Sequence, residues 1–455
     1  MTDALTAALE TPAYDDEALL RLVDLLAQAD SRDDEFAART ALARLGGRPR
    51  LLLRLDESIR RITSRYADRP APAFEMLLER FAKGRRTPIA LAFAALHRDG
   101  RVRERAVAAI AARPLPELVS LLVLRADDWA PQVRNPARAA LTRLLSDQPG
   151  RYLAGAVPMA VKLTDRYRGR FAQVLVAAAV LAAPDDVRRQ LATSPDRDQR
   201  RLAFDADLHQ GRLGLAALAD LAVRESDAQI RNRAAQLAYE QAVVRQHRPT
   251  LERLFGARPA GVRALGLTGL LRLGPAAEAA AALDDPAPLI RAIARDAARR
   301  AGTDVVAYYR TTEPSPGSVA GLAEAGSDRD APVLVALLSH PSGPIRAAAV
   351  RALGHLGAVP VELVVPLVRD PAPAVVREAA LALRPFDRRL PPGLGWELLG
   401  DSRSEVRRAG YRLLNGRDPV TRRRAALRLA GDPDPRLAAR GRADALALPA
   451  RPTRS

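Results

Sequence analysis

The sequence predicts an all-α fold, in which about 12 to 14 helix pairs stack into an α-α superhelix. Two observations predict it. A phrase consisting of Asp, four variable residues, Val or Ile, and then Arg returns along the chain, and 31 residues separate Arg346 from Arg377 while 30 separate Arg377 from Arg407. Around each copy the apolar residues have the spacing of one helix face. A return interval of this length is typical of arrays in which each repeat packs on the next.

Copies of the phrase mark the repeats. The clearest centre on Val133–Arg134, Ile230–Arg231 and Ile290–Arg291, and further copies centre on Ile345–Arg346, Val376–Arg377 and Val406–Arg407. Arg103, Arg201 and Arg263 continue the phase. The gaps of 67 residues before Arg201 and 55 before Arg346 each leave room for one degenerate copy.

Each copy predicts two helices joined by a short polar turn. After the arginine, Ile345, Ala349, Ala352, Leu353 and Leu356 form one apolar stripe at helical spacing, and the series Val133, Ala137, Leu141 and Leu144 forms another. A second apolar run precedes each turn, at 118–126, 333–339 and 362–369. Alternating apolar and polar residues, the pattern of strands, are absent from the sequence.

The turns carry helix-start and helix-stop signals. Asp285 followed by Pro286 predicts a helix start, because the Asp oxygen accepts an N–H of the first turn and proline needs no donor there. Glycines close the other end, at Gly46-Gly47, Gly274-Pro275, and Gly354 with Gly357. Glycine at these positions can take the left-handed conformation that ends a helix.

These features resemble the HEAT-repeat family, in particular its short bacterial form, the PBS-lyase HEAT-like repeat. The resemblance covers residues 90–440 well and the first 90 loosely. It implies a HEAT-like α-solenoid whose second helices line a concave surface. It also implies a ladder of polar contacts between neighbouring repeats, made by the turn acid and the following arginine.

The residues that match this ladder lie six apart in most copies. The pairs are Asp128/Arg134, Glu225/Arg231, Asp285/Arg291 and Asp401/Arg407. Asp370 and Arg377 lie seven apart, and His340 takes the place of the acid before Arg346, so we expect the ladder to be incomplete.

We expect three regions along the chain. Residues 1–90 are predicted as divergent N-terminal helical repeats or a cap, 91–447 as the repeat solenoid, and 448–455 as a disordered tail. The stretch 311–318 is rich in helix breakers and is predicted as a hinge or insertion.

Composition narrows the class of protein. The absence of cysteine excludes disulfides, thiolate nucleophiles and Cys-ligated metal. The N-terminus has no signal-peptide pattern, and the longest apolar run, Val174–Ala183, is too short to span a bilayer. We therefore expect a cytoplasmic protein without membrane contact.

The net charge of +18 raises the question of nucleic acid. Only Lys83 and Lys162 are lysines among 71 basic residues, a skew that a GC-rich coding genome produces without selection for a basic surface. A basic solenoid still attracts polyanions. The densest basic run, Arg422, Arg423 and Arg424, is the candidate for polyanion contact, although three consecutive helix residues point in different directions.

Catalytic signals are absent from the sequence. It has no GxxxxGK[ST] loop, no GxSxG elbow and no HExxH motif, and its histidines are dispersed: His97, His209, His247, His340 and His355. We expect no catalytic, cofactor or metal site.

Trp129 follows Asp127 and Asp128 and superficially resembles the groove residues of bacterial HEAT-like DNA glycosylases. The other tryptophan, Trp396, is many repeats away, and Asp128 has a structural role as cap and ladder residue. We therefore interpret Trp129 as a packing residue in a turn.

The sequence favours a non-enzymatic scaffold or adaptor that presents a concave surface to a protein or an extended peptide. The alternative is a solenoid that binds the DNA backbone and is related to the HEAT-like DNA glycosylases. A lyase subunit that attaches a bilin pigment rests on the repeat's name alone.

Overall fold

The computed structural model describes residues 2–10, 16–32, 34–62, 72–166, 168–274 and 277–447. These residues form 29 α-helices, joined by turns and short 3-10 segments, and contain no β-strand. The predicted all-α class is therefore confirmed. The predicted disordered tail at 448–455 and Pro275 lie outside the described residues.

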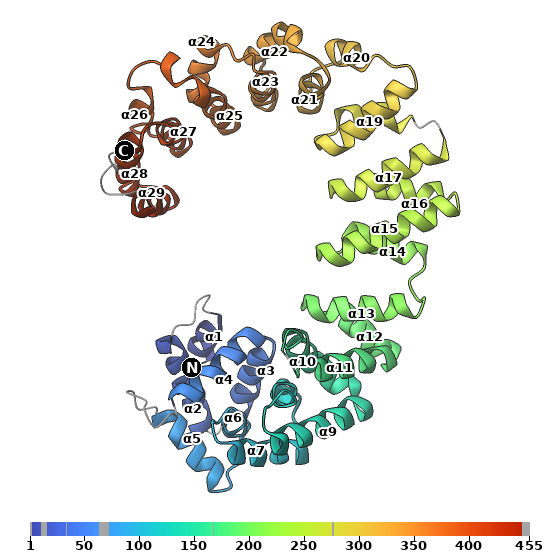
Figure 1. The fold of residues 1–455 in the computed structure, drawn as a ribbon, viewed down its shortest axis with the longest axis vertical. Helices are drawn as coiled ribbons and strands as arrows, with labels where there is room; N and C mark the ends of the chain where they lie inside the picture. Colours follow the sequence, from blue (N-terminus) through green and yellow to red (C-terminus); the bar gives the residue numbers. More distant parts are fainter. Residues whose placement is uncertain are drawn as a thin grey trace. The chain divides into compact units, whose positions relative to one another are not determined.

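The chain forms two compact units, 1–214 and 215–455. Each is a stack of short helices (Figure 1). The predicted boundary near residue 90, which rested on sequence divergence, stays a prediction.

Unit 1 has thirteen α-helices in its described residues and one 3-10 turn. They are α1 (Thr2–Glu10), α2 (Asp16–Ser31), α3 (Glu35–Gly46), α4 (Pro49–Ile62), α5 (Pro72–Ala82), α6 (Pro88–Ala95), α7 (Gly100–Ala112), η1 (Pro116–Leu118), α8 (Val119–Arg125), α9 (Pro131–Asp147), α10 (Pro149–Lys162), α11 (Arg170–Ala182), α12 (Asp185–Ala192) and α13 (Arg197–His209).

Unit 2 contains the remaining α-helices, several of them extended by 3-10 turns. They are α14 (Leu215–Arg224), α15 (Ala228–Val244), α16 (Arg248–Phe255), α17 (Ala260–Leu273), α18 (Glu278–Ala281), η2 (Ala282–Asp284), α19 (Pro288–Arg300), α20 (Val305–Thr311), α21 (Pro316–Ala325), η3 (Asp328–Asp330), α22 (Ala331–Ala336), η4 (Leu337–Ser339), α23 (Gly343–His355), α24 (Val361–Val364), η5 (Val365–Arg369), α25 (Pro373–Leu383), η6 (Arg384–Arg389), α26 (Leu394–Leu398), α27 (Ser404–Asn415), α28 (Pro419–Ala430) and α29 (Pro435–Ala447).

The packing is that of stacked helix pairs. In unit 2, α14 packs on α15 and α16 on α17, and the second helices then pack on one another, α15 on α17 and α17 on α19. The series α21, α23, α25 and α27 repeats this arrangement. Within unit 2 these second helices lie along one side of the stack and the first helices along the other (Figure 1).

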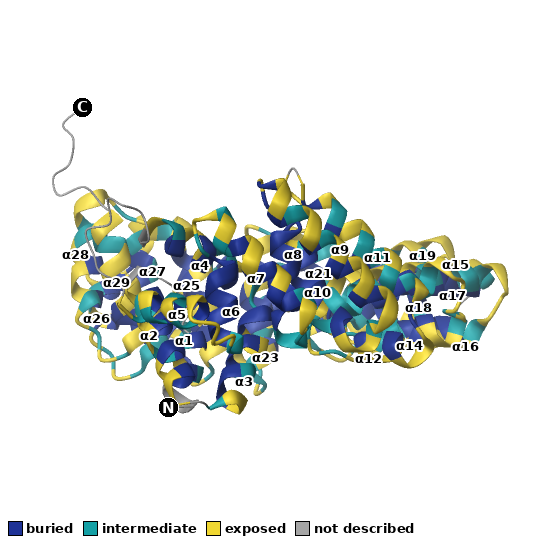
Figure 2. Cartoon of the chain, turned by 90° about the horizontal axis from the view of Figure 1, so that it is seen from below, coloured by how far each residue is buried: buried dark blue, intermediate teal, exposed yellow. Residues whose placement is uncertain are grey.

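The core follows the predicted apolar stripes. Val133, Ala137 and Leu141 are fully buried, as are Ala349 and Leu353. Burying such side chains contributes about 25 cal/mol for each Å² of apolar surface removed from water. The buried residues form continuous bands between the helices of each unit (Figure 2). Each helix pair is thus stabilised by its neighbours in the stack.

Helix starts differ in detail from the prediction at the Asp-Pro turns. In the turn before α19, Asp285 accepts a hydrogen bond from the backbone N–H of Ala287 at 2.7 Å, and Pro288 rather than Pro286 occupies the first helical position. The helix begins two residues later than predicted because Asp285 closes a turn of its own before the N-cap. Both oxygens of Asp285 also accept hydrogen bonds from Arg263.

Two of the predicted stop signals have different outcomes. Gly357, just beyond α23, has φ of 67°, which is the left-handed conformation predicted for it. Gly47 after α3 has φ of −71°, so the prediction of a left-handed glycine is wrong there. The N–H of Gly47 still bonds back to the carbonyls of Ala43 and Leu45, so a right-handed residue satisfies the helix end.

Half of the predicted hinge at 311–318 is helix. α20 ends at Thr311, and Ser315 caps α21 with a reciprocal hydrogen-bond pair to Ser318. Only residues 312–315 lie between the two helices. Proline and glycine here start a helix, because Pro316 occupies the first turn, where no N–H is needed.

Candidate functional site

The repeated arginine binds the turn of its own repeat through the backbone. Arg134 donates to the carbonyl oxygen of Asp128 at 3.0 Å, and Arg346 donates to that of His340 at 2.8 Å. Because the acceptor is a backbone oxygen, histidine serves here as well as an acid. The same bond joins Arg103 to His97 (2.9 Å), Arg231 to Glu225 (3.1 Å), Arg263 to Ala257 (3.2 Å), Arg291 to Asp285 (2.7 Å) and Arg407 to Asp401 (3.1 Å).

The carboxylate of the turn acid binds the arginine of the preceding repeat instead. Both oxygens of Asp128 accept hydrogen bonds from Arg103, at 2.8 and 2.9 Å. Such paired bonds combine charge with fixed geometry. The other rungs are Arg263 to Asp285 (3.1 and 2.9 Å), Arg346 to Asp370 (2.9 and 2.7 Å) and Arg407 to Asp432 (2.8 and 2.8 Å). We call these four pairs the rungs.

Each rung therefore connects three segments. One oxygen of the rung acid also accepts the backbone N–H two residues ahead, as Asp432 does from Asp434 at 2.8 Å. The hydrogen bonds lower the pKa of Asp432, the contribution of Arg407 being the largest. The rungs thus fix the start of one second helix against the turn of the next pair.

Besides Arg377, three of the predicted arginines make no rung of this kind in the described part of the chain: Arg134, which binds backbone oxygens, Arg231 and Arg291. Arg291 binds Glu324 of α21 at 3.1 Å, because the degenerate repeat after α19 supplies its acid from a helix. Arg231 faces the turn at Ala257, where the acid is missing, and its Nε is buried without a hydrogen-bond partner in the described part of the chain.

Arg377 makes no rung because it lies one residue later in α25 than the rung position. The equivalent position is taken by Val376, which is fully buried, and Arg377 instead contacts Glu378 on the exposed face of the helix. Arg403 takes over the missing bonds, since it donates to the carbonyl oxygens of Asp370 at 2.9 Å and Arg369 at 2.8 Å. Asp401 accepts the backbone N–H of Arg403.

Arg201, which continued the repeat interval in the sequence, is likewise not the arginine that binds the turn. Its neighbour Arg200 makes the bonds of this position, donating to the carbonyl oxygens of Ser194 at 2.7 Å and Pro195 at 3.0 Å. Two adjacent arginines in one sequence cannot be told apart by period alone.

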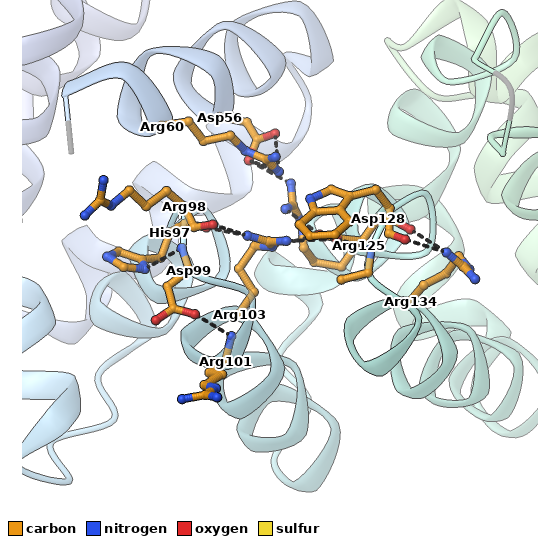
Figure 3. Close-up of polar contacts among 12 residues, drawn as sticks. Asp56, Arg60, His97, Arg98, Asp99, Arg101, Arg103, Arg125, Asp128 and Arg134 are labelled. Atoms are coloured by element: carbon orange, nitrogen blue, oxygen red, sulfur yellow. Dashed lines mark hydrogen bonds and ion pairs between the residues drawn. The ribbon is translucent and has the colours of Figure 1, made fainter. Parts of the chain in front are cut away.

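The first rung belongs to a buried charge cluster in unit 1 (Figure 3). The side chains of Arg103 and Asp128 are fully buried, and Arg125 of α8 lies against both Asp128 at 2.9 Å and Asp56 of α4 at 2.7 Å. Arg60 completes the cluster at 3.2 Å from Asp56. Charges buried this deeply are tolerated when every partner is present.

The pKa values in this cluster reflect burial and pairing together. Burial raises the pKa of Asp128, but the bonds from Arg103 and the charge of Arg125 outweigh it, so the pKa lies below its ordinary value. Burial lowers the pKa of the Arg125 guanidinium, opposed by the charges of Asp56 and Asp128. Asp128 is therefore an enclosed anion that is not available as a catalytic base.

Trp129 lies at the edge of this cluster and is 64 % exposed. The prediction that it packs in the turn is therefore wrong. Its backbone is held, because its carbonyl oxygen accepts a bond from Arg134 at 3.0 Å, and its neighbour Asp128 is fixed by the rung. The small buried residues Ala126 and Ala130 occupy the interior of this turn. The ring thus extends outward from a rigid turn.

A cleft of about 270 Å³ adjoins the ring. It is lined by Asp56, Glu57, Arg60, Arg125, Asp127, Asp128, Trp129 and Arg166. Asp127 is half-buried there, and burial raises its pKa against the lowering effect of Arg166, whose guanidinium lies 3.6 Å away. The cleft therefore offers an aromatic side chain beside charges of both signs.

A larger cavity of about 720 Å³ lies among α2, α3, α6 and α7 of the same unit. Its charged lining residues are Asp30, Asp34, Glu35, Arg85, Arg86 and Arg113. Asp30 is almost fully buried and accepts a bond from Arg80 at 2.8 Å and another from Thr87. With acids and arginines balanced, this cavity does not select ligands of one charge.

Arg422, Arg423 and Arg424 do not form one surface. Arg424 is exposed and lies over the ring of Trp396, 5.5 Å from its centroid, while Arg422 and Arg423 are half-buried around α28. Consecutive helix residues diverge by about 100°, so the three point to different sides of α28, and polyanion contact through them stays a prediction.

A different set of arginines does share a surface. Arg384, the C-cap of α25, lies seven residues after Arg377 of that helix and therefore on the same side of it, and on α27 Arg408 and Arg412 are four apart. Arg351 of the adjacent α23 binds Glu378 of α25 at 3.0 Å. We call these five residues the arginine patch. Burial lowers the pKa of Arg412, and the charges of Arg408, Arg377 and Arg384 lower it further.

Sequence reasoning missed both the rung partners and the patch. An arginine followed 22 to 25 residues later by an acid, as for Arg263 and Asp285 or Arg103 and Asp128, was the signal for the rungs. The patch needed the register of three helices, which depends on where each one starts.

Metal-binding clusters and membrane-spanning helices are both missing from the described part of the chain. It contains no group of three or more His, Asp or Glu side chains arranged to hold a metal ion. None of its helices has both the length and the apolar character needed to cross a bilayer.

Comparison with known proteins gives one family match. Residues 317–384, from α21 to α25, match the family model described as HEAT repeats. No curated protein matches the chain. The match supports the predicted HEAT-repeat family, whereas the short bacterial PBS-lyase form stays a prediction.

Two solved structures are similar over most of the chain. One is an engineered protein, with 18 % identity, 95 % of this chain and 98 % of that chain covered, and a TM-score of 0.17. The other is importin beta, with 17 % identity, 95 % of this chain covered and a TM-score of 0.25. This chain covers 54 % of that importin beta chain. Within this chain, the segment 317–384 that matches HEAT repeats contains the rung of Arg346 and Asp370.

Proposed function

We propose that this chain is a non-enzymatic scaffold that binds a protein partner, with Trp129 as one contact. The observation that carries the proposal is a tryptophan that is 64 % exposed on a rigid turn with charged groups around it. Tryptophan is enriched among the residues that dominate protein interfaces, where a polar rim surrounds an aromatic centre. Because the turn is already ordered, docking on it costs little entropy.

The charge distribution also bears on the choice between a protein partner and nucleic acid. The recurring arginines Arg103, Arg263, Arg346 and Arg407 are bound to carboxylates of the next repeat. The charges of these four arginines are therefore balanced within the stack, and the net charge of +18 comes from other arginines. Asp128 is enclosed by Arg103 and Arg125, which speaks against this acid as a catalytic group.

A photo-crosslinking amino acid in place of Trp129 tests the proposal in extracts of the source cells. We expect discrete protein adducts that resist nuclease. The control places the same amino acid at Val174, which is 58 % exposed on α11, and should not give these adducts. Identical adducts at both positions, or adducts removed by nuclease, would contradict a protein-binding role for Trp129.

Binding of the DNA backbone is the second candidate, and the arginine patch is the observation that favours it. A duplex-DNA titration at two salt concentrations tests it, because affinity for phosphates falls steeply with salt. No binding at low salt would eliminate this candidate. Base-repair chemistry is a narrower form of it, and the enclosure of Asp128 speaks against that acid as its catalytic group.

A further inference from the structure

The arginine patch surrounds an exposed leucine. Leu381 lies between Arg377 and Arg384 on one face of α25, four residues after the first and three before the second. It is 43 % exposed. The helices on either side of α25 are α23 and α27, which both pack on it and bring Arg351 and Arg412 to its flanks.

The charge of this surface is strongly one-sided. Arg351 and Arg377 have side chains that are 58 % and 52 % exposed, and both bind Glu378, which is itself buried. Glu405 precedes Arg408 by one helical turn on α27. Even with both acids counted against the five arginines, the patch keeps three uncompensated positive charges.

Glu378 also gives the patch a fixed geometry. Arg351 binds both oxygens of Glu378, at 3.0 and 3.2 Å, from the neighbouring helix. Arg377 binds the same carboxylate at 2.7 Å. Two guanidinium groups are thus held about one acid while roughly half of each side chain remains exposed. Such preorganised donors bind an incoming anion with little further loss of side-chain entropy.

We propose that the arginine patch binds an acidic peptide segment of a partner protein, with a leucine-sized apolar residue of that segment packed on Leu381. This rests on the proposed scaffold function and names the chemistry of the partner. The acids of the segment bind Arg351, Arg377, Arg408 and Arg412 by charge-assisted hydrogen bonds. Nucleic acid fits less well, because a phosphate backbone has no apolar group to cover Leu381 and the patch has no aromatic ring on which a base stacks.

The size of the patch sets the length of the segment. Packed helices lie about 8–10 Å apart, so α23 to α27 spans roughly 20 Å, which about six extended residues cover at about 3.3 Å each. Alternate side chains of an extended strand point the same way. A suitable probe is a fluorescein-labelled peptide of about eight residues with acids at alternate positions and one central leucine.

Fluorescence anisotropy with the full chain measures the affinity for this probe at about 0.15 M salt, where weak long-range attraction is screened. The test variant is Arg377→Glu with Arg408→Glu. The matched control is Arg224→Glu with Arg329→Glu, two exposed arginines of unit 2 outside the patch that undergo the same change of charge. We expect the test variant to weaken binding more than about tenfold and the control less than about twofold.

Leu381→Ser separates the apolar contact from the charge and tests the proposal without charge reversal. It should weaken binding of the leucine peptide by about fivefold and leave a peptide with serine in the centre unaffected. Circular dichroism checks that each variant keeps its helices.

Three results would overturn the proposal: equal losses in test and control variants, no effect of Leu381→Ser, or tighter binding of a single-stranded oligonucleotide of similar length than of the peptide. None of them affects the crosslinking at Trp129, which lies in unit 1. If crosslinking at Trp129 succeeds and peptide binding at the arginine patch fails, the scaffold function therefore still stands. If peptide binding succeeds and crosslinking fails, Trp129 is not part of the scaffold function.

Discussion

Arg103 and Asp128 form a doubly hydrogen-bonded ion pair in which both side chains are completely buried. The pair joins α7 to the turn before α9, and Arg125 extends it to Asp56 of α4. The rungs at Asp285, Asp370 and Asp432 have the same form, although their side chains are slightly more exposed. The first rung is therefore the most demanding test of the ladder.

Asp128→Asn should lower the free energy of unfolding by about 3 kcal/mol or more, because it leaves the buried Arg103 without its anion and takes from Arg125 one of its two. Urea denaturation followed by circular dichroism measures the change. The control is Asp147→Asn at the exposed end of α9, where we expect a change within about 0.5 kcal/mol. Similar small changes for both would show that the buried pair is energetically neutral.

Acid should weaken the stack through the rung carboxylates. The pKa values of Asp128, Asp370 and Asp432 are lowered in the folded chain. Their contribution is therefore complete above the unfolded value of about 3.9 and is lost as the pH falls through the lower folded values. Urea midpoints measured between neutral pH and about pH 2.5 should fall most steeply below about pH 4. A shallower acid slope in Asp432→Asn than in Asp147→Asn would confirm the source, and equal slopes would refute it.

Arg403→Ala should destabilise unit 2 by about 1–2 kcal/mol, since the carbonyl oxygens of Asp370 and Arg369 lose their guanidinium donor. Arg408→Ala, on the exposed face of the same helix, should change the free energy of unfolding by less than about 0.5 kcal/mol. Thermal unfolding of both variants makes the comparison. If Arg408→Ala lowers the free energy of unfolding as much, Arg403 has no special role in binding these carbonyl oxygens.

Gly266 of α17 allows a close approach to α16. A Cβ there would lie 2.7 Å from the carbonyl oxygen of Leu251 and closer still to the backbone of Phe255. Gly266→Ala should therefore cost about 2 kcal/mol or more by overpacking. Gly261→Ala in the same helix has open space around it and should instead stabilise by up to about 1 kcal/mol. Opposite shifts in thermal midpoint are the expected outcome, and shifts of the same sign would contradict this packing.

The period and the apolar stripes predicted the class of fold because both follow directly from helix geometry. Val133, Ala137 and Leu141 are buried as their spacing requires. The position of the carboxylate of Asp128 could not be predicted in the same way. The sequence places it six residues before Arg134, but its partner Arg103 belongs to the preceding repeat, and only three-dimensional stacking brings them together.

The exposure of individual side chains could not be predicted from the sequence either. Trp129 and Leu381 are apolar residues in repeats rich in apolar residues, so composition suggests burial for both. Their actual exposure depends on which way a turn faces and on where α25 begins. Boundaries shift by one or two residues without altering the pattern, yet such a shift turns a side chain by about 100° or 200° around the helix.

The single-residue offset in α25 has a consequence for how such chains change over time. Val376 occupies the buried position, so Arg377 does not connect two repeats and instead lies on the exposed face of the helix among other arginines. A valine in the position of the inward arginine, followed by an outward arginine, can therefore contribute to a recognition surface while the turn keeps its length. The neighbouring repeats keep their own rungs, so the rest of the stack need not change.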